Sequence, residues 1–193
     1  MRRRYLGLVS TKSRAVFFDR DGTLIEHVHY LSRLEQIRLM PGVARALKDI
    51  EFMGYKRIVV TNQAAIAKGH LNVEGLRAIQ AELTKQLAAD GAHIDDWYFC
   101  PLAGSADRER VEHADRKPGP GMLLKAAAEH NIDLGGSFMV GDMISDALAG
   151  KNAGCAASIL VGEQSLDLAR HPAVDHYLPT IADLPTLLRQ LHK

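Results

Sequence analysis

Short apolar runs rich in Val, Ile and Phe alternate along this chain with segments of helical periodicity. The clear runs are residues 15–18, 57–60, 97–99, 138–140 and 158–161, and a weaker one covers 176–178. The helical segments between and after them are 41–53, 72–90, 121–130 and 143–152, with a last one after Thr180. A strand that alternates with a helix in this way predicts an α/β fold with a mainly parallel sheet.

Length and composition limit the number of domains and the kinds of partner. The chain has 193 residues, and its 47% hydrophobic content suffices for one substantial core. We expect an N-terminal extension at residues 1–13 and a single domain at 14–193. A formal charge of +1 predicts no nucleic-acid partner, and no apolar stretch approaches the roughly 20 residues that cross a bilayer. Two cysteines far apart in sequence favour a reducing cytoplasm, and we expect a monomer.

Two segments lack periodicity and are predicted to be loops. These are residues 24–40 and residues 101–120, the latter with Pro, Gly and dispersed charge. In parallel α/β sheets a ligand lies outside the carboxyl ends of the strands. We therefore expect both loops to frame a site, and we look for its chemistry where strands end.

The first strand runs directly into two carboxylates, Asp19 and Asp21, followed by Gly22. Packing does not require an apolar strand to end this way, although Asp and Gly are also ordinary turn formers. Two acids in different environments can divide their roles, so that one attacks or binds a metal and the other moves a proton. We interpret Asp19 as a nucleophile and Asp21 as a general acid and base.

Three further strand ends or loops carry polar residues of matching kinds. Thr61, Asn62 and Gln63 offer hydroxyl and amide donors to phosphate oxygens, and Arg116 and Lys117 offer two cations before a helix. After the fourth strand come Asp142 and, one helical turn later, Asp146. Asp142 could complete an oxygen-rich Mg²⁺ site with Asp19, while Asp146 could support Lys117 or a metal-bound water. Each motif alone could be a cap or a turn, but the four together indicate a site.

These residues resemble the four motifs of phosphatases in the haloacid dehalogenase (HAD) superfamily. The matching segments are Asp19-Arg20-Asp21-Gly22-Thr23, Thr61, Lys117 and Gly141-Asp142-Met143-Ile144-Ser145-Asp146. The resemblance covers about residues 14–162. It implies a Rossmann-like sheet and Mg²⁺ held by Asp19, Asp142 and the backbone carbonyl of Asp21. It also implies phosphate contacts from Thr61 and Lys117. The implied activity is phosphomonoester hydrolysis through an aspartyl phosphate.

The spacing of the motifs predicts a branch without a cap domain. The sequence segments in and around the motifs resemble those of the D-glycero-D-manno-heptose 1,7-bisphosphate phosphatases and the related histidinol-phosphate phosphatases. Besides the motifs themselves, the matching residues and segments include Tyr30, Ile66-Ala67-Lys68-Gly69 and the sequence around Lys117, Arg116-Lys117-Pro118-Gly119-Pro120. The resemblance implies a small phosphorylated metabolite as the partner. We expect Tyr30, Asn62, Gln63, Lys68 and Arg116 to bind it.

The chain departs from this branch at a loop that holds zinc in many relatives. Only Cys100, His113 and Asp115 stand at possible ligand positions, whereas a closed structural zinc site needs four ligands. We therefore expect no zinc. Ala64-Ala65 and Met143 also differ from the usual heptose pattern near the expected substrate.

Two alternatives from other functional classes remain open. A receiver-type signalling domain also combines acids, a Thr, a Lys and Mg²⁺, but its phospho-acceptor follows the third strand, where this chain has Cys100-Pro101. A non-catalytic binding protein on the same fold is the second alternative. The complete set of acids and Lys117 favours a phosphatase over both.

Overall fold

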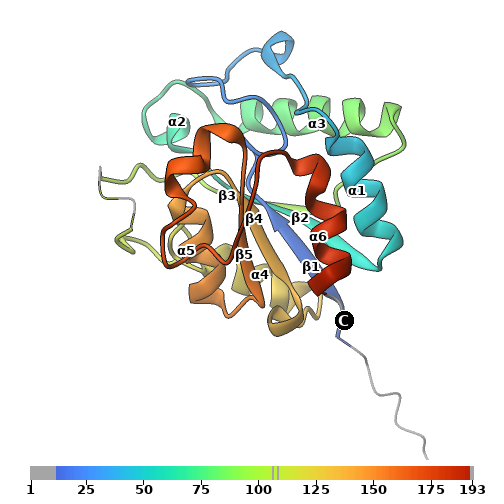
Figure 1. Cartoon of the computed structure of the whole chain (residues 1–193). Coiled ribbons are helices and arrows are strands. Elements are labelled where there is room, and N and C mark those ends of the chain that lie inside the picture. Colours follow the sequence, from blue (N-terminus) through green and yellow to red (C-terminus); the bar gives the residue numbers. More distant parts are fainter. Residues whose placement is uncertain (1–11, 106, 108, 192–193) are drawn as a thin grey trace, which may run out of the picture.

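The computed structural model describes residues 12–191 except 106 and 108. Six parallel strands form one sheet in the order β3-β2-β1-β4-β5-β6. The strands are β1 (Arg14–Phe18), β2 (Tyr55–Asn62), β3 (Asp96–Cys100), β4 (Phe138–Gly141), β5 (Ala157–Val161) and β6 (His176–Leu178). The sheet runs through the middle of the molecule (Figure 1), which confirms the predicted HAD-type, Rossmann-like α/β class.

Helices cover both faces of the sheet. They are α1 (Val43–Phe52), α2 (Ala64–Ala67), α3 (Val73–Ala89), α4 (Gly121–Glu129), α5 (Ile144–Ala153) and α6 (Leu184–Leu191), with 3-10 turns η1 (Leu34–Gln36), η2 (Leu134–Gly136), η3 (Glu163–Leu168) and η4 (Ile181–Asp183). Val16 and Phe18 of β1 share one apolar core with α1, α3 and α6, whereas Ala15 and Phe17 share the other with α4 and α5. Alternate residues of a strand point to opposite faces, so β1 is buried on both sides.

The structure shifts some predicted boundaries. Pro41 was expected in the first turn of a helix, but α1 begins at Val43 after Gly42, whose φ of 82° is left-handed and non-helical. Asn72 caps α3 as its side-chain oxygen accepts a hydrogen bond from the Gly75 amide at 2.8 Å. Helix α2 was not expected, because four residues are too few to show a helical period.

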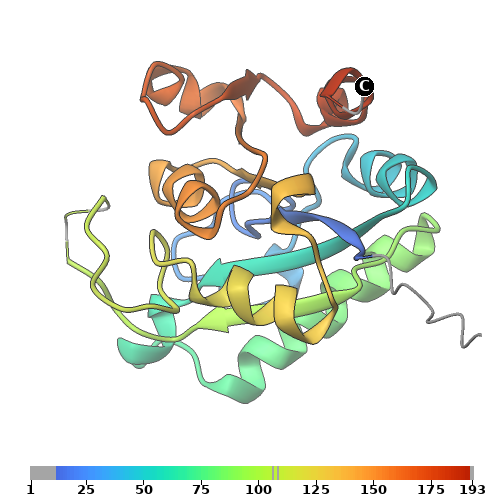
Figure 2. The same cartoon turned by 90° about the horizontal axis from the view of Figure 1, so that it is seen from below.

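Both predicted loops lie at the carboxyl ends of the strands. Residues 24–40 contain only η1, and the described part of residues 101–120 contains no helix or strand. Figure 2 shows the second loop, in yellow-green, extending from the end of β3 to one side of the sheet. Of the predicted N-terminal extension, residues 1–11 lie outside the described part, and Ser13 forms a bridge with Ile132.

Candidate active site

Asp19 stands at the carboxyl end of β1, near the centre of the sheet. Strand β1 pairs with β2 on one side and β4 on the other. The Asp19 amide donates to the carbonyl of Val140 at 2.9 Å, which prolongs the β1–β4 ladder by one residue. The next carboxylate, Asp21, and the Asp142 that follows β4 therefore lie at the same edge.

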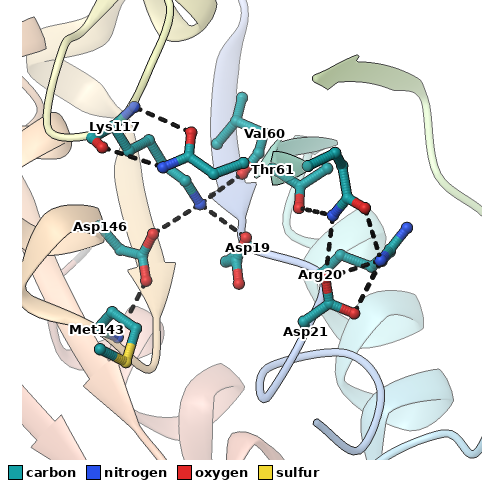
Figure 3. A network of polar contacts seen from close by, with 10 residues as sticks. Asp19, Arg20, Asp21, Val60, Thr61, Lys117, Met143 and Asp146 are labelled. Carbon is teal, nitrogen blue, oxygen red and sulfur yellow. Dashed lines mark hydrogen bonds and ion pairs between the residues drawn. The ribbon is translucent and has the colours of Figure 1, made fainter. Parts of the chain in front are cut away.

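Lys117 joins two of the predicted acids. Its ammonium lies 2.7 Å from Asp19 Oδ1 and 2.6 Å from Asp146 Oδ1, and it donates to the carbonyl of Val60 at 2.8 Å (Figure 3). All three donors of the ammonium are thus used, and the side chain is 2% exposed. Two hydrogen bonds join the side chain of Asn62 to the backbone of Lys117. Asn62 Nδ2 donates to the Lys117 carbonyl at 3.0 Å, and the Lys117 amide donates to Asn62 Oδ1 at 3.1 Å. The side-chain amide of Asn62 is thus bonded to the Lys117 loop, and its predicted contact with a substrate stays a prediction.

Two glycines allow the acids to come close. Gly22 has a φ of +78°, and a Cβ there would lie 2.3 Å from Asp142 Oδ2. A Cβ on Gly141 would lie 2.4 Å from the side chain of Asp146. Asp146 itself is held by the Met143 amide, which donates to its Oδ2 at 3.0 Å. Close packing of two turns around the carboxylates explains why each motif contains a glycine.

Negative charge exceeds positive charge in this cluster. Burial raises the pKa of Asp19 to about 6, helped by the charges of Asp146 and Asp21 and opposed by Lys117. Burial and the charges of Asp19 and Asp146 raise the pKa of Asp142 to about 8. Burial works against the charged form of Lys117, but Asp146 and Asp19 outweigh it and raise the pKa of Lys117. The cluster therefore lacks a cation when its carboxylates are ionised.

A second network surrounds Asp21. The Arg20 guanidinium holds the Asp21 carboxylate through Nε and Nη2 at 2.8–3.1 Å. The Gln63 amide accepts from Arg20 at 3.0 Å and donates to Asp21 Oδ2 at 3.0 Å and to Thr61 Oγ1 at 2.9 Å. Figure 3 shows Arg20, Asp21 and Thr61 gathered on the side of Asp19 away from Lys117.

A cavity of about 360 Å³ opens over both networks. Every predicted site residue except Thr61 lines it; these lining residues are Asp19, Asp21, Tyr30, Asn62, Gln63, Lys68, Arg116, Lys117, Asp142 and Asp146. Thr61 is buried beneath Gln63. Lys68 donates to the Tyr30 hydroxyl at 2.9 Å, and Arg116 Nη1 donates to the carbonyl of Leu102 at 2.6 Å. The cations of two loops thus lie at the cavity wall.

Sequence reasoning missed several residues of the site. Arg20 had no predicted role of its own, yet an arginine between two acids at the end of a buried strand is a pattern that could have indicated one. His70 stacks on Tyr30 with ring centroids 4.2 Å apart, and Arg110 and Glu112 line the cavity. Ser165 donates to the carbonyl of Asp142 at 2.7 Å. No local pattern marks these four residues, because their partners come from other loops.

The donor set suits a hard divalent cation. Oxygen atoms of Asp19, Asp142 and Asp146 lie within 4.8 Å of one another. Asp142 Oδ1 is buried and has no hydrogen-bond partner among the described residues. Few carboxylates plus room for water and phosphate are what Mg²⁺ prefers. No second group of three ligand residues occurs in the described chain, so Cys100, His113 and Asp115 do not form one, and the absence of zinc stays a prediction.

Comparisons with known proteins agree with this geometry. A family model described as HAD-hydrolase-like matches residues 114–184. The D-glycero-beta-D-manno-heptose-1,7-bisphosphate 7-phosphatase of Pasteurella multocida is 39% identical over 92% of this chain and 98% of its own. The D-glycero-alpha-D-manno-heptose-1,7-bisphosphate 7-phosphatase of Burkholderia mallei is 37% identical over 78% of this chain and 80% of its own. The D,D-heptose 1,7-bisphosphate phosphatase of B. bronchiseptica, solved with magnesium and phosphate, has a TM-score of 0.80 and 28% identity, covering 92% of this chain and 99% of that one.

The intervals between the motifs hold no inserted domain in the described part of the chain. Residues between Asp19 and Thr61 form η1, α1 and most of β2, and those between Thr61 and Lys117 form α2, α3, β3 and a loop. With this arrangement of acids and the likeness over nearly its whole length, the chain belongs to the HAD superfamily, as a phosphatase of the branch without a cap domain.

Proposed function

We propose that this phosphatase acts on a sugar bisphosphate, with D-glycero-D-manno-heptose 1,7-bisphosphate as the first substrate to test. The observation that carries the proposal is the cluster in which Lys117 bridges Asp19 and Asp146 beside Asp142, under a cavity walled by further cations. The names of the relatives supply the sugar, because no contact within this chain specifies a heptose.

Magnesium would be held by the carboxylates of Asp19 and Asp142 and by the backbone carbonyl of Asp21. The surplus of buried negative charge and the unpartnered Asp142 Oδ1 support this assignment. Bound there, the ion would supply positive charge that offsets the charge on the transferring phosphoryl group.

In the first step, an Asp19 oxygen forms a bond to phosphorus while the bond from phosphorus to the sugar oxygen breaks. Asp21 gives its proton to that leaving oxygen, which departs as an alcohol. In the second step, water forms the bond to phosphorus, the bond to Asp19 breaks, and Asp21 takes a proton from the water. Lys117, whose three donors are already used within the protein, would offset the charge of the phosphoryl group through its own charge, and the expected contact from Thr61 requires its buried hydroxyl to reach the phosphate.

Substrate binding would come from the loops, since no cap covers the cavity. Within the described part of the chain, the Lys68 and Arg116 side chains each donate one hydrogen bond, to Tyr30 and to Leu102, and have further donors for an anion. We infer that they bind the phosphate that is not cleaved, with Tyr30 beside Lys68. The binding energy of this remote group would position the scissile ester. A reducing cytoplasm, a monomeric state and the absence of a nucleic-acid partner stay predictions beside this proposal.

A substrate panel tests this proposal. Phosphorylated sugars, including both anomers of the heptose bisphosphate, are compared with histidinol phosphate and nucleotides, using wild type, Arg116→Ala and Asp19→Asn. We expect kcat/KM for a bisphosphate to exceed that for the matching monophosphate, Arg116→Ala to erase most of the difference, and Asp19→Asn to abolish turnover. A tenfold preference for histidinol phosphate would refute the sugar, and turnover by Asp19→Asn would refute the mechanism.

A further inference from the structure

The Arg20 side chain is buried against Asp21 at the wall of the cavity. It is 2% exposed, whereas the Asp21 side chain that it holds is 22% exposed and reaches the cavity. A buried guanidinium needs a compensating acceptor, and Asp21 is the only carboxylate that contacts it among the described residues. Three hydrogen bonds between the two side chains restrict the carboxylate to one orientation.

Arg20 also determines which way the Gln63 amide faces. Because a guanidinium only donates, the end of Gln63 beside Arg20 must be its oxygen, at 3.0 Å. The amide nitrogen is thereby directed at Asp21 Oδ2 and at Thr61 Oγ1. Thr61 accepts this bond, so its own hydroxyl proton is left to donate to another acceptor.

We propose that Arg20 is a positioning residue that fixes the Asp21 carboxylate for both proton transfers, and that Gln63 couples this carboxylate to the Thr61 hydroxyl. The inference deepens the proposed function and rests on its two-step mechanism. In this role neither residue forms a bond with the substrate or exchanges a proton with it. Their effect passes through the direction of one carboxylate and one hydroxyl group, and a misdirection of about 1 Å is enough to slow a reaction markedly.

The two steps depend differently on Asp21, which makes the proposal testable. An aryl phosphate such as 4-nitrophenyl phosphate releases a stable phenolate that needs no proton, so its first step should tolerate a misplaced Asp21. Its second step still needs Asp21 as a base. An alkyl ester such as a sugar phosphate needs Asp21 in both steps.

The main variant is Arg20→Lys, which keeps the charge but cannot form the forked contact with a carboxylate. With 4-nitrophenyl phosphate, we expect a rapid burst of one nitrophenolate per enzyme at a rate within about threefold of wild type, followed by a steady state slowed at least about tenfold. The phosphoenzyme should accumulate. With the sugar phosphate, the first turnover itself should slow at least about tenfold.

Arg45→Lys is the matched control, because Arg45 is 79% exposed on α1 and, among the residues that the structure describes, its ion pair is with Asp49 alone. Circular dichroism and thermal unfolding show whether Arg20→Lys folds. If it does not, the same burst and steady-state measurements are made on Gln63→Met, with Gln86→Met on α3 as its control. Gln63→Met should also slow the second step more than the burst.

The proposal is overturned if the folded variant loses the burst and the steady state equally, which is the pattern of general damage, or if it matches wild type in both. A wild-type protein that hydrolyses neither ester, or that retains turnover as Asp19→Asn, overturns the proposed function itself. Failure of the positioning role is therefore seen in the Arg20 or Gln63 variant, whereas failure of the proposed function is seen in wild type or Asp19→Asn.

Discussion

Asp142→Asn should make the metal-free protein more stable while weakening the site that we assign to magnesium. Asp142 is 6% exposed, and one of its oxygens has no hydrogen-bond partner among the described residues. Burial together with the charges of Asp19 and Asp146 raises its pKa from an ordinary 3.8 to about 8. The fold therefore favours the neutral acid, and asparagine supplies a neutral group of the same size.

The pKa shift gives the sign and the size of the effect. Between pH 3.8 and about 8, the folded protein binds more protons than the unfolded chain, so the free energy of unfolding falls as pH rises. Since one pH unit in a pKa corresponds to ~1.4 kcal/mol, the ionised carboxylate costs at most about 6 kcal/mol. Because water entry and the sharing of charge with Asp19 reduce this value, we expect Asp142→Asn to gain ~2–4 kcal/mol at about pH 8 and little at about pH 4.

The assay is urea unfolding with a chelator at both pH values and again with excess Mg²⁺. Wild type should gain stability from Mg²⁺ at about pH 8, because a ligand that binds only the folded state stabilises it, and Asp142→Asn should lose most of this gain. Asp167→Asn, an exposed acid in η3, is the control and should change neither quantity. A metal-free Asp142→Asn protein no more stable than wild type at about pH 8 would refute the charge-crowding argument, and undiminished stabilisation by Mg²⁺ would refute the ligand assignment.

Two further changes probe the packing of the cluster. Gly22→Ala should both destabilise the protein and reduce Mg²⁺ affinity measured by calorimetry, because its Cβ would strike Asp142; Gly54→Ala, with a φ of +82° and nothing within 4 Å, should show only the backbone cost of ~1–2 kcal/mol. Equal effects of the two alanines would contradict the close approach. Lys117→Met should lower the free energy of unfolding by ~3–5 kcal/mol near neutral pH, because it leaves Asp19 and Asp146 buried without their cation. Acid should restore part of that loss by protonating Asp19, and a loss that grows as pH falls would contradict the pairing.

The sequence allowed the strands and the residues at their ends to be predicted, because both depend on local pattern. An apolar run followed by acids is visible within ten residues, as in Val16 to Asp21, and parallel topology then brings such ends together. The roles of Asn62 and Gln63 could not be read in this way. Their side chains bind Lys117 and Arg20, which are 55 and 43 residues away, so their partners exist only in the fold.

The predicted start of α1 was wrong, and α2 was not predicted, for a different reason. Pro41 is compatible with the first turn of a helix and with the residue before its cap, and only the left-handed conformation of Gly42 separates the two. Helix α2 is a single turn that follows Gln63, whose own side chain is held by Arg20. Tertiary contacts, rather than propensity, set the chain direction at both places.

The two networks at the end of β1 differ in whether their charges balance. Arg20, Asp21, Gln63 and Thr61 bind one another, and their charges balance within the pair Arg20–Asp21. The cluster of Asp19, Asp142, Asp146 and Lys117 holds three carboxylates against one ammonium, so a further cation is needed when all three carboxylates are ionised. Metal removal should therefore disturb phosphoryl transfer while leaving Asp21 held in place. Because the Asp21 side chain is held by Arg20 and Gln63 rather than by the carboxylates of the cluster, a variant can lose one function and keep the other, which is why single-turnover and metal-binding measurements separate the two networks.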